Sequence, residues 1–323
     1  MKATLRIGTR GSALALYQAE LAKTKIERDF PLVVVEIVKI KTSGDMIRRG
    51  VVNPFETKRV YTREIEEALL KKEIDLAVHS AKDLAVQMPD GLKIGAVLER
   101  EDARDCLINL EKKKLSELAM GARVGTSALR RRMQIQRLNP QVSIEDVHGN
   151  VDTRIRKLED GEHDALCLAY AGVKRLGLVN HVSEVFPEEM FYPAGGQGVI
   201  VVQCRALDAA VDEILEPVHH RVTGKMLDCE RAFLKKLGGG RQLPCGIYTK
   251  IESHVLTAAG ALFSTEERKW VEDKVEGSSE NPAEVGERLG EMILAKGGSH
   301  ILEKMRYAVE KKKKFPSPLE GED

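Results

Sequence analysis

The sequence predicts an α/β protein with two similar lobes and a small α+β third domain. Three observations lead to this prediction. Short apolar runs alternate with helical patterns through the first half of the 323-residue chain, which is typical of parallel α/β units. A strand–turn–helix pattern of the first part recurs weakly in the second. Beyond residue 218 the pattern changes to longer helices around alternating strands, which indicates a separate domain.

The first lobe is predicted to cover residues 1–98 and 199–216. Its apolar and helical patterns are a strand (LRIG, 5–8), a helix (SALALYQAELAKTKIERDF, 12–30), a strand (VVVEIVKI, 33–40), a helix (REIEEALLKK, 63–72) and a strand (IDLAVHS, 74–80). Residues 46–62 lack periodicity and contain Gly and Pro, so we expect a mobile loop there. VIVVQCR (199–205), after the glycine turn PAGGQG, is predicted to be a strand that returns to this lobe. The chain would then cross twice between the two lobes, and the two crossings would form a hinge.

The second lobe is predicted to cover residues 104–195, because its patterns repeat those of the first. IGTRGSALA (7–15) resembles VGTSALRRR (124–132): both run from a strand through Gly-Thr and Ser into a helix. EIDLAVHSAKD (73–83) resembles HDALCLAYAGVKR (163–175), since each has an acidic turn, a buried strand and then a basic residue.

The third domain is predicted to cover residues 218–307. It starts with a helix (TGKMLDCERAFLKKL, 223–237), continues with alternating runs such as HVLTAAGALF (254–263) and ends with a helix (PAEVGERLGEMILAKG, 282–297). The charged tail at 308–323 is predicted to be disordered.

Composition excludes several classes of function. The 51 basic and 50 acidic residues balance, and aromatic residues make up 4%, so neither a nucleic-acid nor a membrane-surface partner is expected. There is no apolar run of 18 residues and no signal-peptide pattern, so no membrane span is predicted. The five cysteines form no C-x-x-C and the eight histidines show no ligand spacing. No metal site is therefore predicted, and packed cysteines suggest the reducing cytoplasm.

Cationic residues gather where strands lead into helices. Helix N-termini bind anions, and the turns that contain Ser12, Thr126 and Ser127 fit this geometry, with Ser12 and Ser127 as possible N-caps. Arginines at these places oppose the helix dipole unless an anion is bound. The cations of the cluster are Arg10, Lys82, Arg130, Arg131, Arg132, Arg154, Arg156 and Arg175. We favour a cleft for a polyanionic ligand over a set of caps and surface ion pairs.

Asp83 is the one carboxylate in this cluster. Among cations it is expected to stay charged, so it could stabilise a developing cation or accept N–H bonds. An ion pair with Lys82 or a nearby arginine is the simpler alternative.

The motifs as a set resemble the porphobilinogen deaminase (hydroxymethylbilane synthase) family from about Leu5 to beyond Leu302. They are RIGTRGSALAL, AVHSAKD, EREDARDCL, VGTSALRRR, GNVDTR, AGVKRLGL, PAGGQGVIVVQCR, ERAFL and LGGGRQLP. The resemblance implies two lobes like those of a periplasmic binding protein, a third α+β domain, a monomer and a cytoplasmic enzyme of heme biosynthesis. The implied transferase reaction joins four porphobilinogen molecules head to tail, with loss of ammonia, into hydroxymethylbilane.

The resemblance also implies roles for particular residues. Asp83, with Lys82, would be catalytic, because the matching aspartate handles pyrrole N–H groups and stabilises cationic intermediates. Lys58 matches a lysine of the family's mobile loop. The implied carboxylate-binding residues are Arg10, Ser12, Thr126, Ser127, Arg130, Arg131, His148, Gly149, Asn150, Arg154 and Arg175. The family's dipyrromethane cofactor is linked through a thioether to a cysteine in a glycine loop of the third domain.

The sequence departs from the family at that cysteine, where it has Arg241. Arginine cannot form the thioether. Cys245 lies up to ~14 Å away along an extended chain, and we interpret it as a buried strand residue in preference to a displaced anchor. Other departures around the same ligand are His148 for an arginine, Ala128 for a serine, Ala85 for a proline, Thr57 and Arg59 for glycines, and Tyr61 for a phenylalanine.

These departures leave three hypotheses. The chain is an active deaminase whose cofactor is held by Cys245 or without a covalent bond, or it is a homologue that binds a pyrrole or other polycarboxylate without elongating it. The third hypothesis is a different transferase of tetrapyrrole metabolism. Nucleic-acid binding is a remote fourth.

Overall fold

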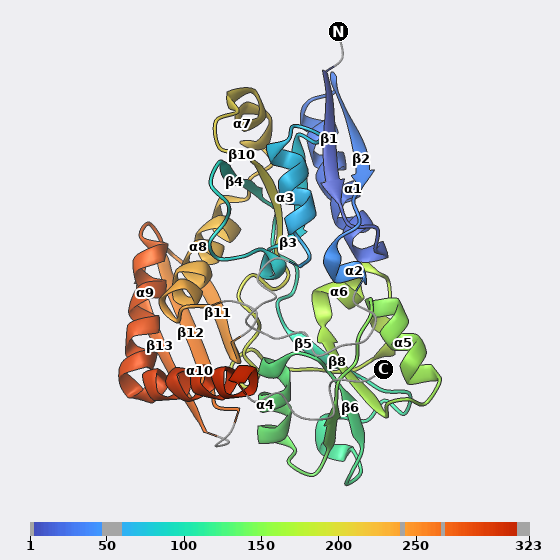
Figure 1. The fold of residues 1–323 in the computed structure, drawn as a ribbon, viewed down its shortest axis with the longest axis vertical. Helices are drawn as coiled ribbons and strands as arrows, with labels where there is room; N and C mark the ends of the chain where they lie inside the picture. The colour runs from blue at the N-terminus through green and yellow to red at the C-terminus, as the bar shows by residue number, and fades with distance from the viewer. Residues whose placement is uncertain (1–2, 47–59, 240–242, 266–268, 315–323) are drawn as a thin grey trace.

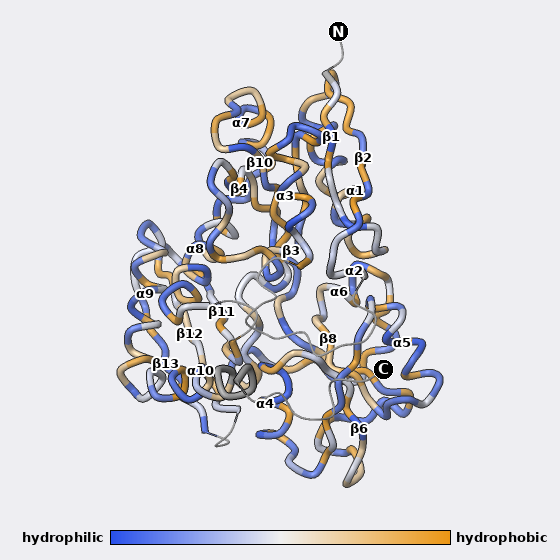
Figure 2. Tube along the Cα trace, in the orientation of Figure 1, coloured by the Kyte–Doolittle hydropathy of each residue, from blue (hydrophilic) through white to orange (hydrophobic). Residues whose placement is uncertain are grey.

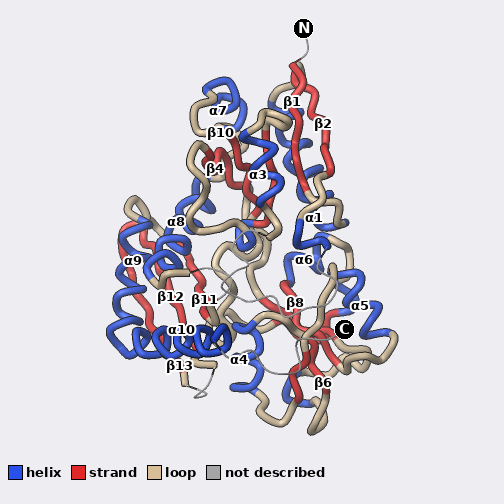
Figure 3. The backbone as a smooth tube through the Cα atoms, viewed as in Figure 1, coloured by secondary structure: helices blue, strands red, loops and turns tan. Residues whose placement is uncertain are grey.

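The computed structural model describes residues 3–46, 60–239, 243–265 and 269–314. Within these residues the strands form two sheets of five strands and one sheet of three. The first sheet lies at the top of Figure 1, the second at the lower right and the third at the lower left. Figure 3 shows that helices pack against each of these groups of strands.

The first sheet combines strands that are far apart in the chain. Its order is β2 (Val33–Lys39), β1 (Ala3–Thr9), β3 (Leu76–Ser80), β10 (Ile200–Arg205) and β4 (Leu92–Val97). β1 pairs in parallel with β2 and β3, whereas β10 is antiparallel to β3 and β4. The helices of this part are α1 (Ala13–Asp29), α2 (Ser43–Met46), α3 (Arg63–Leu70), the 3-10 turn η1 (Ala81–Asp83) and α7 (Ala209–Leu215).

The second sheet repeats this plan. Its order is β7 (Ser143–Glu145), β6 (Arg123–Gly125), β8 (Ala165–Ala169), β5 (Asp105–Ile108) and β9 (Val182–Val185). β6 takes the place of β1, β8 that of β3, and the antiparallel β5 that of β10. The helices are the 3-10 turn η2 (Leu115–Glu117), α4 (Leu129–Leu138), α5 (Val151–Glu159), α6 (Tyr170–Arg175) and the 3-10 turn η3 (Val179–His181). The weak sequence repeat therefore reflects a real structural repeat.

The third sheet is antiparallel, in the order β11 (Cys245–Glu252), β12 (Val255–Phe263) and β13 (Trp270–Ser278). α8 (Arg221–Lys236), α9 (Pro282–Ile293), the π-helical turn η4 (Leu294–Gly298) and α10 (Ser299–Lys314) complete this part. α10 corrects one prediction, because the chain is helical to Lys314 where a disordered tail was expected from residue 308. The domain boundaries remain predictions.

Each part has its own apolar core. Ile7, Leu76 and Val202 lie in the core of the first sheet, while Val124 and Cys167 lie in that of the second. A third core joins α8, β11 and α9. Figure 2 shows hydrophilic residues recurring along α5 and α9, and no helix of the described residues is long and apolar enough to cross a membrane.

Candidate functional site

The predicted site residues follow strands that end at the facing edges of the two lobes. Arg10 and Ser12 come after β1, Lys82 and Asp83 form part of η1 after β3, and Thr126 follows β6. Ser12 is the N-cap of α1, and its hydroxyl accepts a hydrogen bond from the Ala15 amide at 3.3 Å. The ends of parallel strands are the usual position of ligands in α/β sheets.

Arg10 is held by residues from two other elements. Its Nε donates to Asp45 Oδ1 at 3.0 Å, and its guanidinium carbon lies 4.5 Å from the centre of the Tyr61 ring. Asp45 is in turn fixed by the Thr42 hydroxyl at 2.8 Å. Burial raises the pKa of Asp45, but the hydrogen bonds from Arg10 and Thr42 outweigh it, and the pKa is lowered. Arg10 therefore already shares its charge with one carboxylate and is held in a fixed plane.

The end of β3 brings Lys82 next to the crossover between the lobes. Lys82 Nζ donates to Gln197 Oε1 at 3.3 Å. His79 precedes Ser80 at the end of β3 and is buried. Burial lowers the pKa of His79 to about 4. The negative charge of Asp83 opposes this shift, and the positive charge of Arg10 adds to it. His79 therefore stays neutral at physiological pH, close enough to Asp83 and Arg10 to be influenced by both.

Arg130 and Arg131 are buried against a carboxylate that the sequence prediction missed. Asp105 is fully buried, with Oδ2 2.6 Å from Arg130 Nη1 and Oδ1 2.9 Å from Arg131 Nε. Desolvation opposes its charge, but the two guanidinium groups lower its pKa to about 2. The prediction gave these arginines to the binding of an anionic ligand, with ion pairs as the alternative, and the structure pairs both with Asp105. The motif EREDARDCL contained this residue, but the four acidic residues in it left no local signal for which one is buried.

Gln197 is the second residue that sequence reasoning missed. Its Nε2 donates to the Ala103 carbonyl at 2.6 Å and to Asp105 Oδ1 at 2.9 Å, while its Oε1 accepts from Lys82 and, at 3.4 Å, from Arg131. It is fully buried. One side chain on the crossover thus joins a cation of the first lobe to the buried ion pairs of the second.

The turn before α4 differs from the prediction. Ser127 is not the N-cap: its hydroxyl donates to the Val147 carbonyl at 3.2 Å, and Ala128 occupies the cap position without a side-chain bond. Thr126 is buried, and its hydroxyl accepts from the Ala128 amide at 3.4 Å. A one-residue shift of the helix start was enough to change the role of Ser127.

The remaining lobe residues lie at α5 and α6. His148, Gly149 and Asn150 are exposed before α5, where Asn150 is the cap residue without a side-chain bond, and Arg154 Nε donates to the Gly149 carbonyl at 2.8 Å. Arg175, at the end of α6, donates to the Gly198 carbonyl at 2.7 Å, and burial lowers its pKa. Arg175 thus joins the second lobe to the crossover.

In the third domain, Cys245 is the first residue of β11. It is 4% exposed in the apolar core, and burial raises its pKa to about 12. All five cysteines of the chain are free and buried, and burial raises the pKa of each thiol. The structure therefore favours the packed strand residue over the displaced anchor. Lys58 and Arg241 lie outside the described residues.

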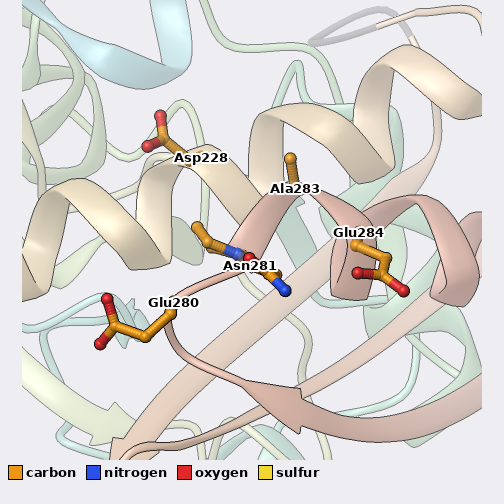
Figure 4. Close-up of a pocket in the computed structure, with 6 residues that line it drawn as sticks. Asp228, Glu280, Asn281, Ala283 and Glu284 are labelled. Carbon is orange, nitrogen blue, oxygen red and sulfur yellow. The ribbon is translucent and has the colours of Figure 1, made fainter.

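A separate hollow at the start of α9 does not suit a polyanion. Figure 4 shows that Asp228, Glu280 and Glu284 surround it, and three carboxylates would repel an anionic ligand. No group of three His, Cys, Asp or Glu side chains in the described ranges could hold a metal ion.

Comparisons with known proteins found family models that match most of the chain. Residues 5–213 match the family model "Porphobilinogen deaminase, dipyromethane cofactor binding domain", and residues 225–295 match "Porphobilinogen deaminase, C-terminal domain". The porphobilinogen deaminase of Carboxydothermus hydrogenoformans is 42% identical over 306 residues, which are 95% of this chain and 98% of that protein. The porphobilinogen deaminase of Geobacter metallireducens is 41% identical over 313 residues, which are 97% of this chain and 98% of that protein.

The two five-stranded lobes with their helices and the smaller three-stranded domain confirm the predicted class of mixed α/β lobes beside a small third domain. A methionine-binding lipoprotein of Bacillus subtilis covers 68% of this chain and 91% of its own, with a TM-score of 0.42 and 15% identity. This likeness concerns the fold alone.

Proposed function

The chain belongs to the porphobilinogen deaminase family, and from that premise we propose that it condenses four porphobilinogen molecules head to tail into hydroxymethylbilane, with loss of ammonia. The observation that carries the proposal is the link from Lys82 of one lobe, which precedes Asp83 in η1, through Gln197 to Arg131 of the other lobe. Acetate and propionate groups of the substrate are the anions that such arginine forks bind.

We assign Asp83 the main catalytic role. When the substrate's carbon–nitrogen bond breaks, ammonia leaves and a cation remains on the pyrrole. A fixed carboxylate at the end of β3 can accept the pyrrole N–H and stabilise that charge. The neighbouring His79 is neutral, so it does not compete with the substrate as a cationic partner of Asp83.

We assign Lys82 and the arginines to orientation of the substrate. Gln197 holds the Lys82 ammonium group in place. Asp45 binds one edge of the Arg10 guanidinium, and a fork of five donors still has N–H groups for a second carboxylate. The proposed carboxylate-binding set also includes Ser12, Thr126, Ser127, Arg130, Arg131, His148, Gly149, Asn150, Arg154 and Arg175.

The residues of this chain fit the carboxylates of the family's dipyrromethane cofactor but not its thioether link. The cationic donors suit its carboxylates. Its thioether link has no counterpart, because residue 241 is arginine and every cysteine is buried with a raised pKa. A buried thiol supplies little thiolate, which is the reactive form. We therefore propose that any dipyrromethane in this protein is held by its carboxylates alone.

The burial of the cysteines also favours a second candidate function. A homologue that binds porphobilinogen or another polycarboxylate without elongating it needs no anchor. Its lobes would use the same arginines, and Arg241 and His148 would change its specificity.

Mass spectrometry combined with an activity assay separates these functions. The intact mass of the purified protein is measured, the digest is searched for an adduct, and porphobilinogen consumption is followed with tetrapyrrole release. We expect no adduct together with turnover. An adduct on Cys245 would refute non-covalent retention, and binding without turnover would leave only the non-elongating homologue.

A further inference from the structure

One face of α4 docks against the third domain. Arg130, Met133, Gln134 and Arg137 are spaced i, i+3, i+4 and i+7, so they lie on one side of the helix; we name them the α4 docking face. Met133 packs against a cluster that contains Ala259, Ala261 and Phe263 of β12, together with Tyr192. Figure 1 shows α4 between the second lobe and the third domain. The helix that carries two site arginines is therefore also an interdomain contact.

The C-terminal end of this face reaches the edge strand β13. The Arg137 guanidinium carbon lies 4.1 Å from the centre of the Trp270 ring, and its Nη1 lies 3.3 Å from Glu272 Oε2. Trp270 and Glu272 are two residues apart and so project from the same side of the strand. Trp270 is 39% exposed and the Arg137 side chain 29%. A stack and an ion pair at such exposure are each modest contacts, and Arg137 makes both with the same side of β13.

The other end of the face holds the segment before β10, at Tyr192. Arg130 donates to the Tyr192 carbonyl at 2.5 Å, and Gln134 Oε1 accepts from the Tyr192 amide at 2.7 Å. The Tyr192 ring stacks on Tyr248 of β11 with centres 6.0 Å apart.

The start of β11 lies directly against this segment. The Ile247 amide donates to the Pro193 carbonyl at 2.8 Å. A Cβ atom at Gly246 would come within 2.6 Å of Tyr192, so only glycine permits the approach. The α4 docking face thus determines where β11 begins relative to Arg130 and Arg131.

We propose that Arg137 is a positioning residue that, through its stack on Trp270, holds the third domain in register with the arginine cluster of the lobes. This inference rests on the proposed function, in which each condensation requires the third domain and the lobes to face each other in a fixed arrangement. Porphobilinogen binds in the lobes, so its affinity does not depend on Arg137. The rate of bond formation does.

The chain has one tryptophan, so its fluorescence reports directly on this contact. Arg137→Gln removes the stack and the ion pair, and Arg137→Lys keeps the charge without the planar group. Arg123→Gln is the matched control, because Arg123 belongs to the same lobe but pairs with Asp164 of that lobe at 3.0 Å. For Arg137→Gln we expect altered tryptophan emission, faster hydrogen exchange in β11 and β13, and a kcat about three- to tenfold lower. KM should stay within about twofold, Arg137→Lys should be intermediate, and Arg123→Gln should behave like the wild type.

Two results would overturn the proposal. One is tryptophan emission and hydrogen exchange in Arg137→Gln equal to those of the wild type. The other is a raised KM with unchanged kcat, which would place Arg137 in substrate binding. If neither the wild type nor any variant consumes porphobilinogen, the proposed function fails, but emission and exchange still decide whether Arg137 positions the third domain.

Discussion

At the scale of single residues, the main feature is that site cations are paired within the protein. Asp45 holds Arg10, and Asp105 holds both Arg130 and Arg131. A buried pair keeps a guanidinium group oriented, although burying the charges is costly. The two arginines and Asp105 together carry a net single positive charge, so they can still attract an anion without leaving two cations unpaired in the interior.

The first prediction concerns Asp83. Asp83→Ala should lower kcat for porphobilinogen consumption by at least about 100-fold, because a fixed charge near a developing cation is among the largest catalytic effects. The fold should persist, since Asp83 lies in a short turn at the sheet edge. Steady-state kinetics with circular dichroism tests this, and unchanged turnover in a folded variant would remove Asp83 from the mechanism.

The second prediction concerns His79 and pH. Burial lowers the pKa of folded His79 from 6.5 to about 4, so between these values the unfolded chain binds a proton that the folded chain does not. Above about pH 6.5 neither state binds this proton, so neutral His79 costs the folded protein no stability. As the pH falls towards 4, the unfolded chain gains the proton first, and the free energy of unfolding falls. A shift of this size corresponds to about 3 kcal/mol of the free energy of unfolding.

Urea unfolding at a series of pH values measures this effect. His79→Gln should flatten the fall in the free energy of unfolding between pH 6.5 and 4, whereas the same change at the exposed His300 should leave it intact. An equally steep fall in the His79 variant would assign the acid sensitivity to other groups.

At the scale of elements, α4 serves both the site and the interdomain contact. Its N-terminal turn supplies Arg130 and Arg131, and its C-terminal turn supplies Arg137. Its start, however, is poorly capped, because Ala128 has no side-chain acceptor for the free backbone amides.

The third prediction follows from this cap. Ala128 has extended backbone angles that suit an N-cap serine, so Ala128→Ser should raise the free energy of unfolding by about 0.5–2 kcal/mol. Chemical denaturation measures the change, with the exposed Ala119→Ser as a control expected to be near zero. A destabilised Ala128→Ser variant would show that the added hydroxyl disturbs the packed turn instead.

At the scale of the whole molecule, one buried ion pair joins all three parts. Arg100 follows the first lobe, and its Nη1 lies 2.5 Å from Glu230 of α8. Glu230 also accepts from the Gly196 amide at 2.6 Å and from Thr249 of β11 at 2.7 Å. Arg100 lies on one crossover between the lobes and Gly196 on the other, and both bind Glu230 of the third domain. The Glu230 side chain is fully buried.

The fourth prediction tests this connection. Glu230→Gln leaves the Arg100 guanidinium, whose side chain is only 10% exposed, without its carboxylate partner, so the free energy of unfolding should fall by about 3–5 kcal/mol. Glu291→Gln, which breaks the exposed pair with Lys236, should cost less than about 1 kcal/mol. Equal small losses in both variants would mean that water reaches Glu230 and that the connection is weak.

Much of the fold could be predicted because its signals are local. The apolar strand that ends at Ser80 and the repeat between residues 7–15 and 124–132 depend only on neighbouring residues, and the structure contains both. α10 was missed because a lysine-rich segment has little apolar periodicity to indicate a helix. Ser127 was misplaced because capping depends on where the helix begins to within one residue.

The sequence by itself determined the family, the third-domain position at which an arginine replaces the cofactor cysteine, and the excess of arginine where strands end. Only the tertiary structure decided which charges are already paired, since Asp105 and Gln197 meet their partners across 25 and 66 residues of sequence. It also decided the state of Cys245, because desolvation in a core built from α8, β11 and α9 determines its reactivity and its neighbours in sequence do not. Burial and long-range electrostatics depend on what surrounds a side chain in space, which no local pattern records.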